Sequence, residues 1–330
     1  MDMNTVKLTK DNMKLLGRAF DTGDGIELVF PGDGVEFTVY AAKELTLTTT
    51  LDRTVYLTAF VDGTEVPDRC RLKDDEASEC VIVRVREGKH TIRIVQDSEV
   101  GIQGGAVVLK RITGLFEPET LQPTAQKKLY VEFVGDSITA GCGTLGNRSS
   151  DWHISFHAGS KAYSYQTAEL LNADYSIIAK GGIGLSRPNH EVTVEDMFLL
   201  RNGWKDRQTP ADLSRVPQVI ICALGDNDSQ RDPDTIVHDR LTEFAGVLRQ
   251  RAPEAKIVFL CCMMMEHLHA ETIPQVCEEL GGAAKNYYAL RMPTGSHGAI
   301  SGGDEGIGHP SAEDDRIGAV RLASFLREIL

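Results

Sequence analysis

Apolar and polar residues alternate along the first third of the chain. In GVEFTVY the apolar positions are Val35, Phe37 and Val39, and a period of two predicts a β-strand with one buried face. The same character recurs in GIELVF, LTLTTT, TVYLTAFVDG, CVIVRV, HTIRIV and AVVLKRI. REGK, between CVIVRV and HTIRIV, predicts a hairpin turn. Many short strands without a helical period predict an antiparallel sandwich or jelly roll.

The pattern changes near residue 120. The segment 115–128, LFEPETLQPTAQKK, contains two prolines and no clear period, which favours a linker. We therefore expect two domains, a β-rich domain over 1–118 and a second domain over 119–330.

The second domain alternates between strand and helix patterns. Apolar runs predict buried strands, and 3.6-residue periods predict helices. Ser311 and Asp314 have the spacing of a capping box at the start of the last helix. The expected strands cover 129–134, 174–182, 216–225 and 255–264, and the expected helices cover 161–173, 233–253 and 311–330. This alternation predicts a mostly parallel sheet with helices on both faces.

Composition and charge limit the classes of function that the protein can have. Among 330 residues, 35 Lys and Arg face 48 Asp and Glu, a formal net charge of −13. This balance argues against a general binder of nucleic acid or of an anionic membrane. No apolar run approaches the ~18 residues of a membrane span, and the first twenty residues show no apolar core of a signal peptide.

The cysteines give an expectation about the compartment. The spacings contain no CxxC pair and no disulfide framework, and several cysteines lie in apolar runs. We expect reduced, buried thiols in a cytoplasmic protein. The seven are Cys70, Cys80, Cys142, Cys222, Cys261, Cys262 and Cys277.

Candidate chemistry lies where the predicted strands end. Gly135-Asp136-Ser137 follows the strand 129–134 directly. A serine at a strand-to-helix turn can expose its hydroxyl at the sheet edge, but it needs a base to become a nucleophile. Taken alone, the segment is better explained as a helix cap by Asp136 or Ser137.

Residues in three further loops favour a catalytic serine over a simple helix cap. Gly182 lies in the glycine-rich exit loop at the end of 174–182, after the strand DYSIIA, where backbone N–H groups can approach an oxyanion. Asn227 follows the strand 216–225 and offers a side-chain N–H, and His309 precedes the last helix, where it can act as a general base. Each residue has an ordinary structural explanation, but their common placement at element ends favours one catalytic site.

These blocks resemble a known family. VEFVGDSITAGCGT, IAKGGIGLSRP, ALGDND and GHPSAEDD are similar to the four blocks of the SGNH, or GDSL-like, hydrolases. A β-rich domain before such a module resembles more specifically carbohydrate esterase family 2. The resemblance implies a flavodoxin-like three-layer α/β/α domain with a mostly parallel sheet, preceded by an all-β jelly roll. It also implies removal of O-acetyl groups from acetylated xylan or mannan oligosaccharides, with no metal and no cofactor.

The resemblance assigns roles to residues. Ser137 is the expected nucleophile and His309 the base, and the oxyanion donors are the Ser137 and Gly182 backbone N–H groups with the Asn227 side chain. The family's Asp three residues before the histidine is replaced by Gly306. Asp304, Glu305 or a backbone carbonyl is then left to orient the imidazole, and a Ser–His dyad is favoured.

Other residues are candidates for binding the sugar. Trp152 lies on a loop after the nucleophile, where stacking on a sugar and packing in a small satellite core are equally expected. Asp226 departs from the commoner GTND block and adds a negative charge that bears on the substrate. Arg187 is a weaker candidate at the rim of the cleft.

Two binding motifs are excluded, and two rival functions stay open. The GxGxxG match at 141–146 begins too far after its strand for a dinucleotide site. DNDSQRD has Arg231 where an EF-hand needs glycine. The rivals are a lipase or thioesterase of the same superfamily, and a catalytically inactive carbohydrate-binding protein.

Overall fold

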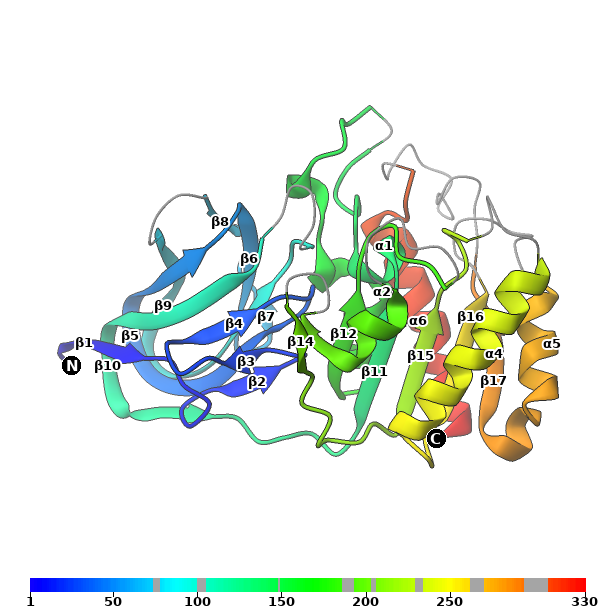
Figure 1. Cartoon of the computed structure of the whole chain (residues 1–330). Helices are drawn as coiled ribbons and strands as arrows, with labels where there is room; N and C mark the ends of the chain where they lie inside the picture. Colours follow the sequence, from blue (N-terminus) through cyan, green and yellow to red (C-terminus); the bar gives the residue numbers. More distant parts are fainter. Residues whose placement is uncertain are drawn as a thin grey trace. The chain divides into compact units, whose positions relative to one another are not determined.

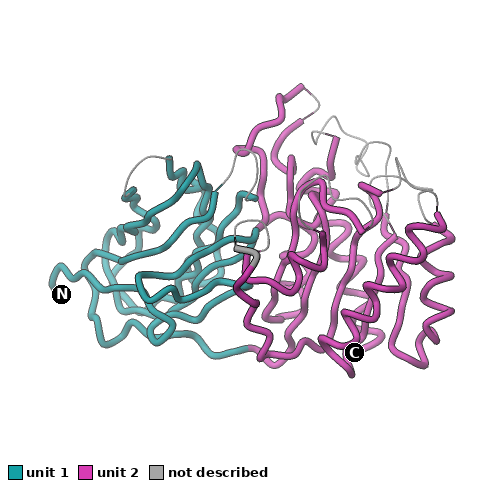
Figure 2. Tube along the Cα trace, in the orientation of Figure 1, with its two compact units in different colours: residues 1–126 teal, residues 127–330 magenta. Residues whose placement is uncertain are grey.

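The computed structural model describes the chain in two compact units. The described residues are 1–73, 78–99, 105–147, 149–185, 193–202, 206–228, 234–261, 270–293 and 308–330. The units are Met1–Gln126 and Lys127–Leu330 (Figure 2). The division falls after Gln126 rather than after residue 118, where the sequence pattern placed it.

The first unit is an antiparallel β-structure. Its long strands β5, β9 and β10 bend around one apolar core (Figure 1), and the expected jelly-roll class is confirmed. The sheet order is β3-β4-β10-β5-β9-β6-β7, with β1 on β10, β2 on β5 and β8 on β6. The strands are β1 Met3–Lys7, β2 Lys14–Leu16, β3 Phe20–Asp21, β4 Ile26–Leu28, β5 Gly34–Leu51, β6 Val55–Val61, β7 Thr64–Glu65, β8 Cys70–Leu72, β9 Ser78–Gln96 and β10 Val107–Pro123.

Side-chain alternation explains how this core forms. Val35 and Phe37 of β5 stand opposite Ile94 and Ile92 of β9, and all four side chains are fully buried. Residues directly opposite in an antiparallel pair point to the same face. The apolar positions of the two strands therefore meet on one side of the sheet.

Two predicted interruptions of the strands are wrong. REGK is not a hairpin turn, because β9 runs through it and Gly88 pairs with Ala41. A shift of register next to this pair absorbs the irregularity, as a β-bulge does. The segment 115–128 is not a linker as far as Pro123, because Phe116 is buried and pairs with Ala41 on the other edge of β5. Pro118 falls in the register shift between Glu117 and Gln122, where its missing N–H is tolerated.

The cysteine prediction is wrong for one pair. Cys70 of β8 and Cys80 of β9 form a disulfide. β8 and β9 lie close together in the folded unit, and this proximity cannot be predicted from the spacing of ten residues. Four cysteines of the described residues are free and buried, as expected: Cys142, Cys222, Cys261 and Cys277.

The second unit has a five-stranded parallel sheet in the order β12-β11-β15-β16-β17. Helices α2 and α6 pack together on one face, and α4 and α5 pack together on the other (Figure 1). The three-layer α/β/α class is therefore confirmed. The sheet strands are β11 Tyr130–Gly135, β12 Asp174–Ala179, β15 Val219–Ala223, β16 Lys256–Cys261 and β17 Tyr287–Arg291, and a hairpin joins β13 Leu200–Asn202 to β14 Asp206–Pro210.

The helices of the second unit show which predictions from the sequence pattern are correct. Their bounds are α1 Ser137–Ala140, α2 Tyr163–Leu170, α3 Val194–Leu199, α4 Asp234–Arg251, α5 Thr272–Glu279 and α6 Ala312–Ile329, with 3₁₀ turns η1 Ile154–Phe156, η2 Gly159–Lys161 and η3 Gly282–Lys285. The predicted capping box at α6 is confirmed, with Asp314 N–H donating to Ser311 Oγ and Ser311 N–H to Asp314 Oδ2. The sequence pattern did not predict α5 and β17.

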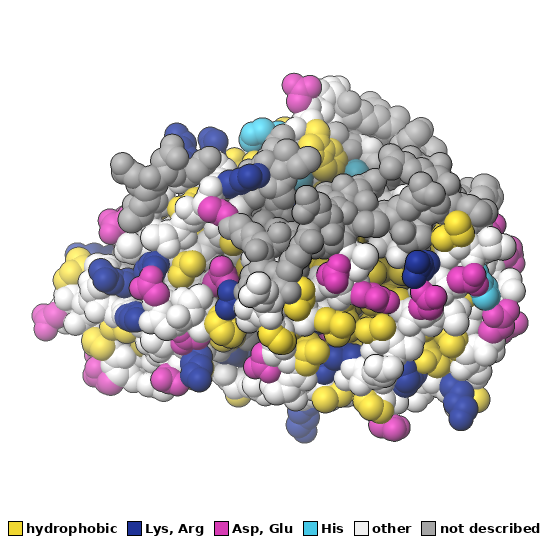
Figure 3. Space-filling view, viewed as in Figure 1, with side chains coloured by type: hydrophobic (Ala, Val, Ile, Leu, Met, Phe, Trp, Pro, Cys, Tyr) yellow, Lys and Arg dark blue, Asp and Glu magenta, His cyan; other side chains and the backbone are white. Residues whose placement is uncertain are grey.

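Lys and Arg side chains lie interspersed with Asp and Glu side chains over the face shown in Figure 3. Within the described ranges, no helix has both the length and the apolar composition needed to cross a bilayer.

Candidate active site

The topology brings the candidate residues to one edge of the parallel sheet. The chain order of the strands reverses direction around β11, which has β12 on one side and β15 on the other. Such a switch point leaves a crevice beyond the carboxyl ends of the strands, where α/β proteins bind their ligands. Ser137 follows β11, Gly182 follows β12 and Asn227 follows β15.

Ser137 is the first residue of α1. Asp136 caps this helix, because its Oδ1 accepts the Ile138 N–H at 3.0 Å, so the capping explanation and the catalytic one hold together. The turn is tight before and after the serine. A Cβ atom on Gly135 would lie 2.0 Å from Thr139 Oγ1, and Gly141 ends the helix at φ 72°. Ser137 itself is half-buried.

His309 lies next to Ser137. Its Nε2 is 2.8 Å from Ser137 Oγ, although the two residues are 172 positions apart in the chain. A serine hydroxyl at this distance from an imidazole nitrogen can pass its proton to the ring as it attacks a carbonyl carbon. The expected pair of nucleophile and base is therefore assembled.

Buried contacts fix the start of α6 and with it the position of His309. Asp315 accepts the Tyr163 N–H at 2.9 Å and the Thr144 hydroxyl at 3.3 Å. The Ala312 N–H donates to the Thr144 carbonyl at 3.1 Å. Burial raises the pKa of the Asp315 carboxyl well above its ordinary value. These bonds tie α6 to α2 and to the segment after α1, six residues or fewer from His309.

The two remaining oxyanion candidates lie in facing loops. Gly182 has φ 77°, a left-handed conformation that favours glycine. Asn227 Nδ2 donates to the Ile183 carbonyl at 2.9 Å and to Asp136 Oδ2 at 3.2 Å. The asparagine thereby joins the loop after β12 to the residue before the nucleophile. The sequence suggested its role as a donor but not these two partners.

Asp228 joins the same two loops and was not predicted. Its Oδ2 accepts the Leu185 N–H at 2.9 Å, and the side chain is fully buried. A Cβ atom on Gly184 would lie 2.7 Å from Asp228 Oδ1. The close approach explains the glycine after Ile183, and only the tertiary contact could have shown it.

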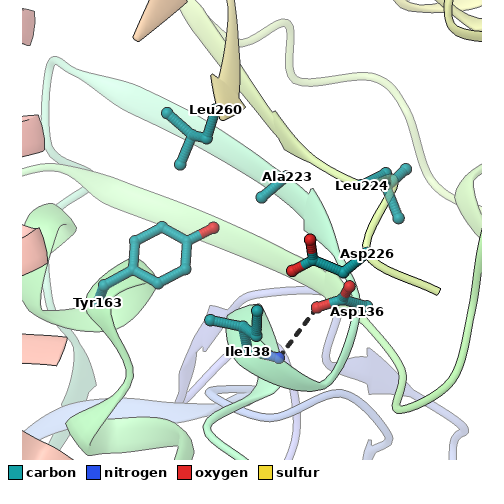
Figure 4. A pocket seen from close by; sticks show the side chains of 7 residues that line it. All are labelled: Asp136, Ile138, Tyr163, Ala223, Leu224, Asp226 and Leu260. Carbon is teal, nitrogen blue, oxygen red and sulfur yellow. Dashed lines mark hydrogen bonds between the residues drawn. The ribbon is translucent and has the colours of Figure 1, made fainter. Parts of the chain in front are cut away.

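A small pocket is lined by Asp136 and Ile138, the residues on either side of Ser137. Its volume of about 20 Å³ is enough for one water molecule. The Asp136 and Asp226 carboxyl groups and the Tyr163 hydroxyl are directed into it (Figure 4). Burial raises the pKa of Asp136 well above its ordinary value, and the negative charges of Asp226 and Asp228 raise it further. The remaining lining residues are Ala223, Leu224 and Leu260.

Trp152 lies beside His309. The ring centroids of Trp152 and His309 are 4.9 Å apart, and those of Trp152 and His157 are 5.2 Å apart. The Trp152 side chain is nevertheless 44% exposed. The ring thus packs on histidines and is also partly exposed, and its stacking on a sugar stays a prediction.

Some predicted residues lie outside the described part of the chain. They are Arg187, Asp304 and Glu305, together with Gly306, whose place in the motif raised the question of a third catalytic residue. The GxGxxG match is described, and it forms turns after α1 rather than a strand-to-helix junction, in agreement with its exclusion.

A serine–histidine pair at the switch point of a parallel sheet is the arrangement of a serine hydrolase. A model of the GDSL-like lipase/acylhydrolase family matches residues 133–297, which is half of the chain. The chain belongs to this family.

Individual relatives match both units. An acetylxylan esterase / glucomannan deacetylase from Cellvibrio japonicus is 24% identical over 341 residues, covering 99% of this chain and 91% of that protein. A family two carbohydrate esterase from Clostridium thermocellum, solved in complex with cellohexaose, has a TM-score of 0.84 at 23% identity over 96% of this chain and 98% of that one. An acetyl xylan esterase from the rumen bacterium Butyrivibrio proteoclasticus has a TM-score of 0.85 at 21% identity over 99% and 98% of the two chains. The two structural similarities show the fold.

Proposed function

We propose that this protein is a serine esterase that removes O-acetyl groups from acetylated carbohydrates such as xylan or mannan oligosaccharides. The observation that carries the proposal is the 2.8 Å contact between Ser137 Oγ and His309 Nε2. The family membership supports an acyl ester as the substrate, and the named activities of the relatives support an acetylated polysaccharide.

The chemistry follows from these residues. Ser137 Oγ attacks the acetyl carbonyl carbon while His309 Nε2 takes the hydroxyl proton. The bond from the carbonyl carbon to the sugar oxygen then breaks, and the imidazolium returns the proton to that oxygen. A water molecule attacks the acetyl-enzyme with His309 again as base, and acetate leaves as Ser137 recovers its proton.

The oxyanion donors are the backbone N–H groups of Ser137 and Gly182 and the amide of Asn227. The bond from Asn227 to the Ile183 carbonyl, at 2.9 Å, holds one amide hydrogen. The bond to Asp136, at 3.2 Å, is longer, so this second hydrogen is the one that the oxyanion shares with Asp136. Such a donor acts mainly in the transition state.

The Asn227→Ala variant is expected to lower kcat by about 10²- to 10³-fold with little change in KM, as removal of one oxyanion donor does. Steady-state kinetics on 4-nitrophenyl acetate measure both constants. Asn147→Ala, in an exposed turn, is the matched control. A fall in the melting temperature of Asn227→Ala with kcat preserved would show that the asparagine only ties the loops together.

Trp152 is the proposed platform for the sugar ring, because it is partly exposed and its ring lies close to His309, and aromatic faces pack on apolar ring surfaces. Asp226 is half-buried and lines the pocket with Asp136, so its influence on the substrate acts through the turn of the nucleophile. Arg187 stays a proposal from the sequence. Action in the cytoplasm is likewise only proposed: the four free cysteines support it, and the Cys70–Cys80 disulfide opposes it.

A panel of substrates tests the proposal. Acetate release is measured with acetylated xylan, acetylated glucomannan and N-acetylated chitin oligosaccharides, and 4-nitrophenol release is measured with 4-nitrophenyl palmitate. We expect release from the first two and little reaction with the amide or the long-chain ester. Preference for palmitate would favour the lipase or thioesterase, and saccharide binding without any hydrolysis would favour the inactive binding protein.

A further inference from the structure

The N-terminal unit has a pocket of its own on β5, β6 and β9. Its volume is about 420 Å³, in the range of sites for small molecules. It combines one aromatic ring with charged groups of both signs. The lining residues are Glu36, Phe60, Asp62, Gly63, Thr91 and Arg93.

The carboxylate of Asp62 is held at this pocket by its own turn. Asp62 and Gly63 have φ angles of 52° and 80° between β6 and β7, as a two-residue type I′ hairpin requires. The Thr91 N–H donates to Asp62 Oδ1 at 2.8 Å, and His90 Nδ1 lies 2.8 Å from Oδ2. These two bonds lower the pKa of Asp62. The side chain is 53% exposed, and each carboxylate oxygen keeps room for a further hydrogen bond.

The guanidinium of Arg93 lies over the Phe60 ring and is held by a carboxylate. Arg93 Nε donates to Glu36 Oε2 at 2.6 Å, and the guanidinium carbon is 5.9 Å from the centroid of Phe60. Glu36 also accepts the Thr124 hydroxyl at 2.5 Å. An arginine fixed by a carboxylate loses little side-chain entropy when it binds a ligand.

The charged and aromatic groups of this pocket determine which class of ligand it can bind. The carboxylates of Glu36 and Asp62 repel an anion, and the guanidinium of Arg93 repels a metal cation. The charged walls also disfavour a fully apolar ligand, which would leave them desolvated. A neutral sugar fits all three groups, because its hydroxyls donate to a carboxylate and accept from a guanidinium while its C–H face packs on the Phe60 ring.

We propose that this pocket is a non-catalytic binding site for a neutral oligosaccharide. It consists only of residues of the N-terminal unit, whereas Ser137 and His309 belong to the other unit. Binding one part of a polymer there raises the effective concentration of its acetyl groups for the same molecule of enzyme. The site therefore concerns long substrates and not small esters.

The test measures binding with unacetylated polymers, so it does not depend on the proposed esterase activity. The full chain is run by native electrophoresis through gels with graded amounts of xylan or glucomannan, and the retardation yields a dissociation constant. The variants are Phe60→Leu, which removes the ring, and Asp62→Asn, which keeps a residue suited to a left-handed turn. Arg84→Gln is the matched control, since Arg84 and Glu44 form an exposed ion pair between the same strands, β9 and β5.

We expect each of the two variants to raise the dissociation constant by about 3- to 10-fold, the loss of one aromatic or charged contact. Arg84→Gln should not change it, and kcat/KM for 4-nitrophenyl acetate should stay within about 2-fold of wild type in all three variants. In NMR spectra of the wild-type protein, xylohexaose should shift the amide signals of residues 60–63 and 91–93. Unchanged retardation of both variants, or shifts confined to residues 127–330, would overturn the proposal. Stronger binding of oligogalacturonate than of neutral polymers would replace it by an anion site.

Discussion

The Ser137→Ala variant is expected to lower kcat for acetyl-ester hydrolysis by about 10⁴- to 10⁶-fold, the loss seen when the nucleophile of a serine hydrolase is removed. The hydroxyl that forms the acetyl-enzyme is gone, whereas the oxyanion donors and the fold remain. Because Ser137 is half-buried and contacts His309 through its hydroxyl alone, its loss leaves the melting temperature nearly unchanged. The measurement is acetate release from acetylated xylan, combined with a thermal unfolding curve.

Two further variants make this result specific. Ser324→Ala removes an exposed hydroxyl on α6 that bonds only within its helix and should keep full activity. His309→Gln retains a hydrogen-bonding side chain but no general base, and it should lose activity to a similar extent, since residues that act as one unit give non-additive losses. If Ser137→Ala released acetate at more than about 1% of the wild-type rate, Ser137 would not be the nucleophile.

The contact between Ser137 and His309 could be predicted although the two residues are far apart in sequence. The patterns of buried strands placed Ser137, Gly182 and Asn227 after successive strands of one parallel sheet, and parallel strands bring their carboxyl ends to one edge. His309 was placed in the loop before the last predicted helix, whose start the capping box of Ser311 and Asp314 indicates. Local rules and one topological rule were therefore enough to bring these residues together, whereas their roles came from the resemblance to the SGNH hydrolases.

The contacts that hold the site together could not be predicted from the sequence. The bonds from Asn227 to Asp136 and from Asp228 to the Leu185 N–H join loops whose separation depends on side-chain packing. The strand errors have a related cause. Gly88 and Pro118 are turn residues by local preference, yet bulges opposite β5 accommodate them within long strands. Tertiary pairing decides between turn and bulge, and a single segment does not contain that information.

The strongest prediction for stability concerns the strand that leads to Ser137. Glu132 of β11 and Arg251 at the end of α4 form an ion pair at 2.8 Å, with side chains only 1% and 3% exposed. The Tyr130 hydroxyl also donates to Glu132, at 3.0 Å. Arg251→Met would leave this carboxylate buried without its counter-charge, and we expect a loss of about 3–5 kcal/mol in the free energy of unfolding. For a unit of this size, that loss corresponds to a melting temperature lower by roughly 6–20 °C.

The double variant Glu132→Leu/Arg251→Met separates the charge from the packing. Removing both partners leaves no buried charge, so the double variant should be more stable than Arg251→Met alone, as replacement of a buried pair by apolar residues often shows. A full return to wild-type stability is not expected, because Arg251 also donates to the Leu213 carbonyl at 3.0 Å. Arg84→Met breaks an exposed pair and should cost less than about 1 kcal/mol. If the losses of Glu132→Leu and Arg251→Met simply added in the double variant, the two side chains would not be coupled, and burial of the ion pair would not determine the stability of β11.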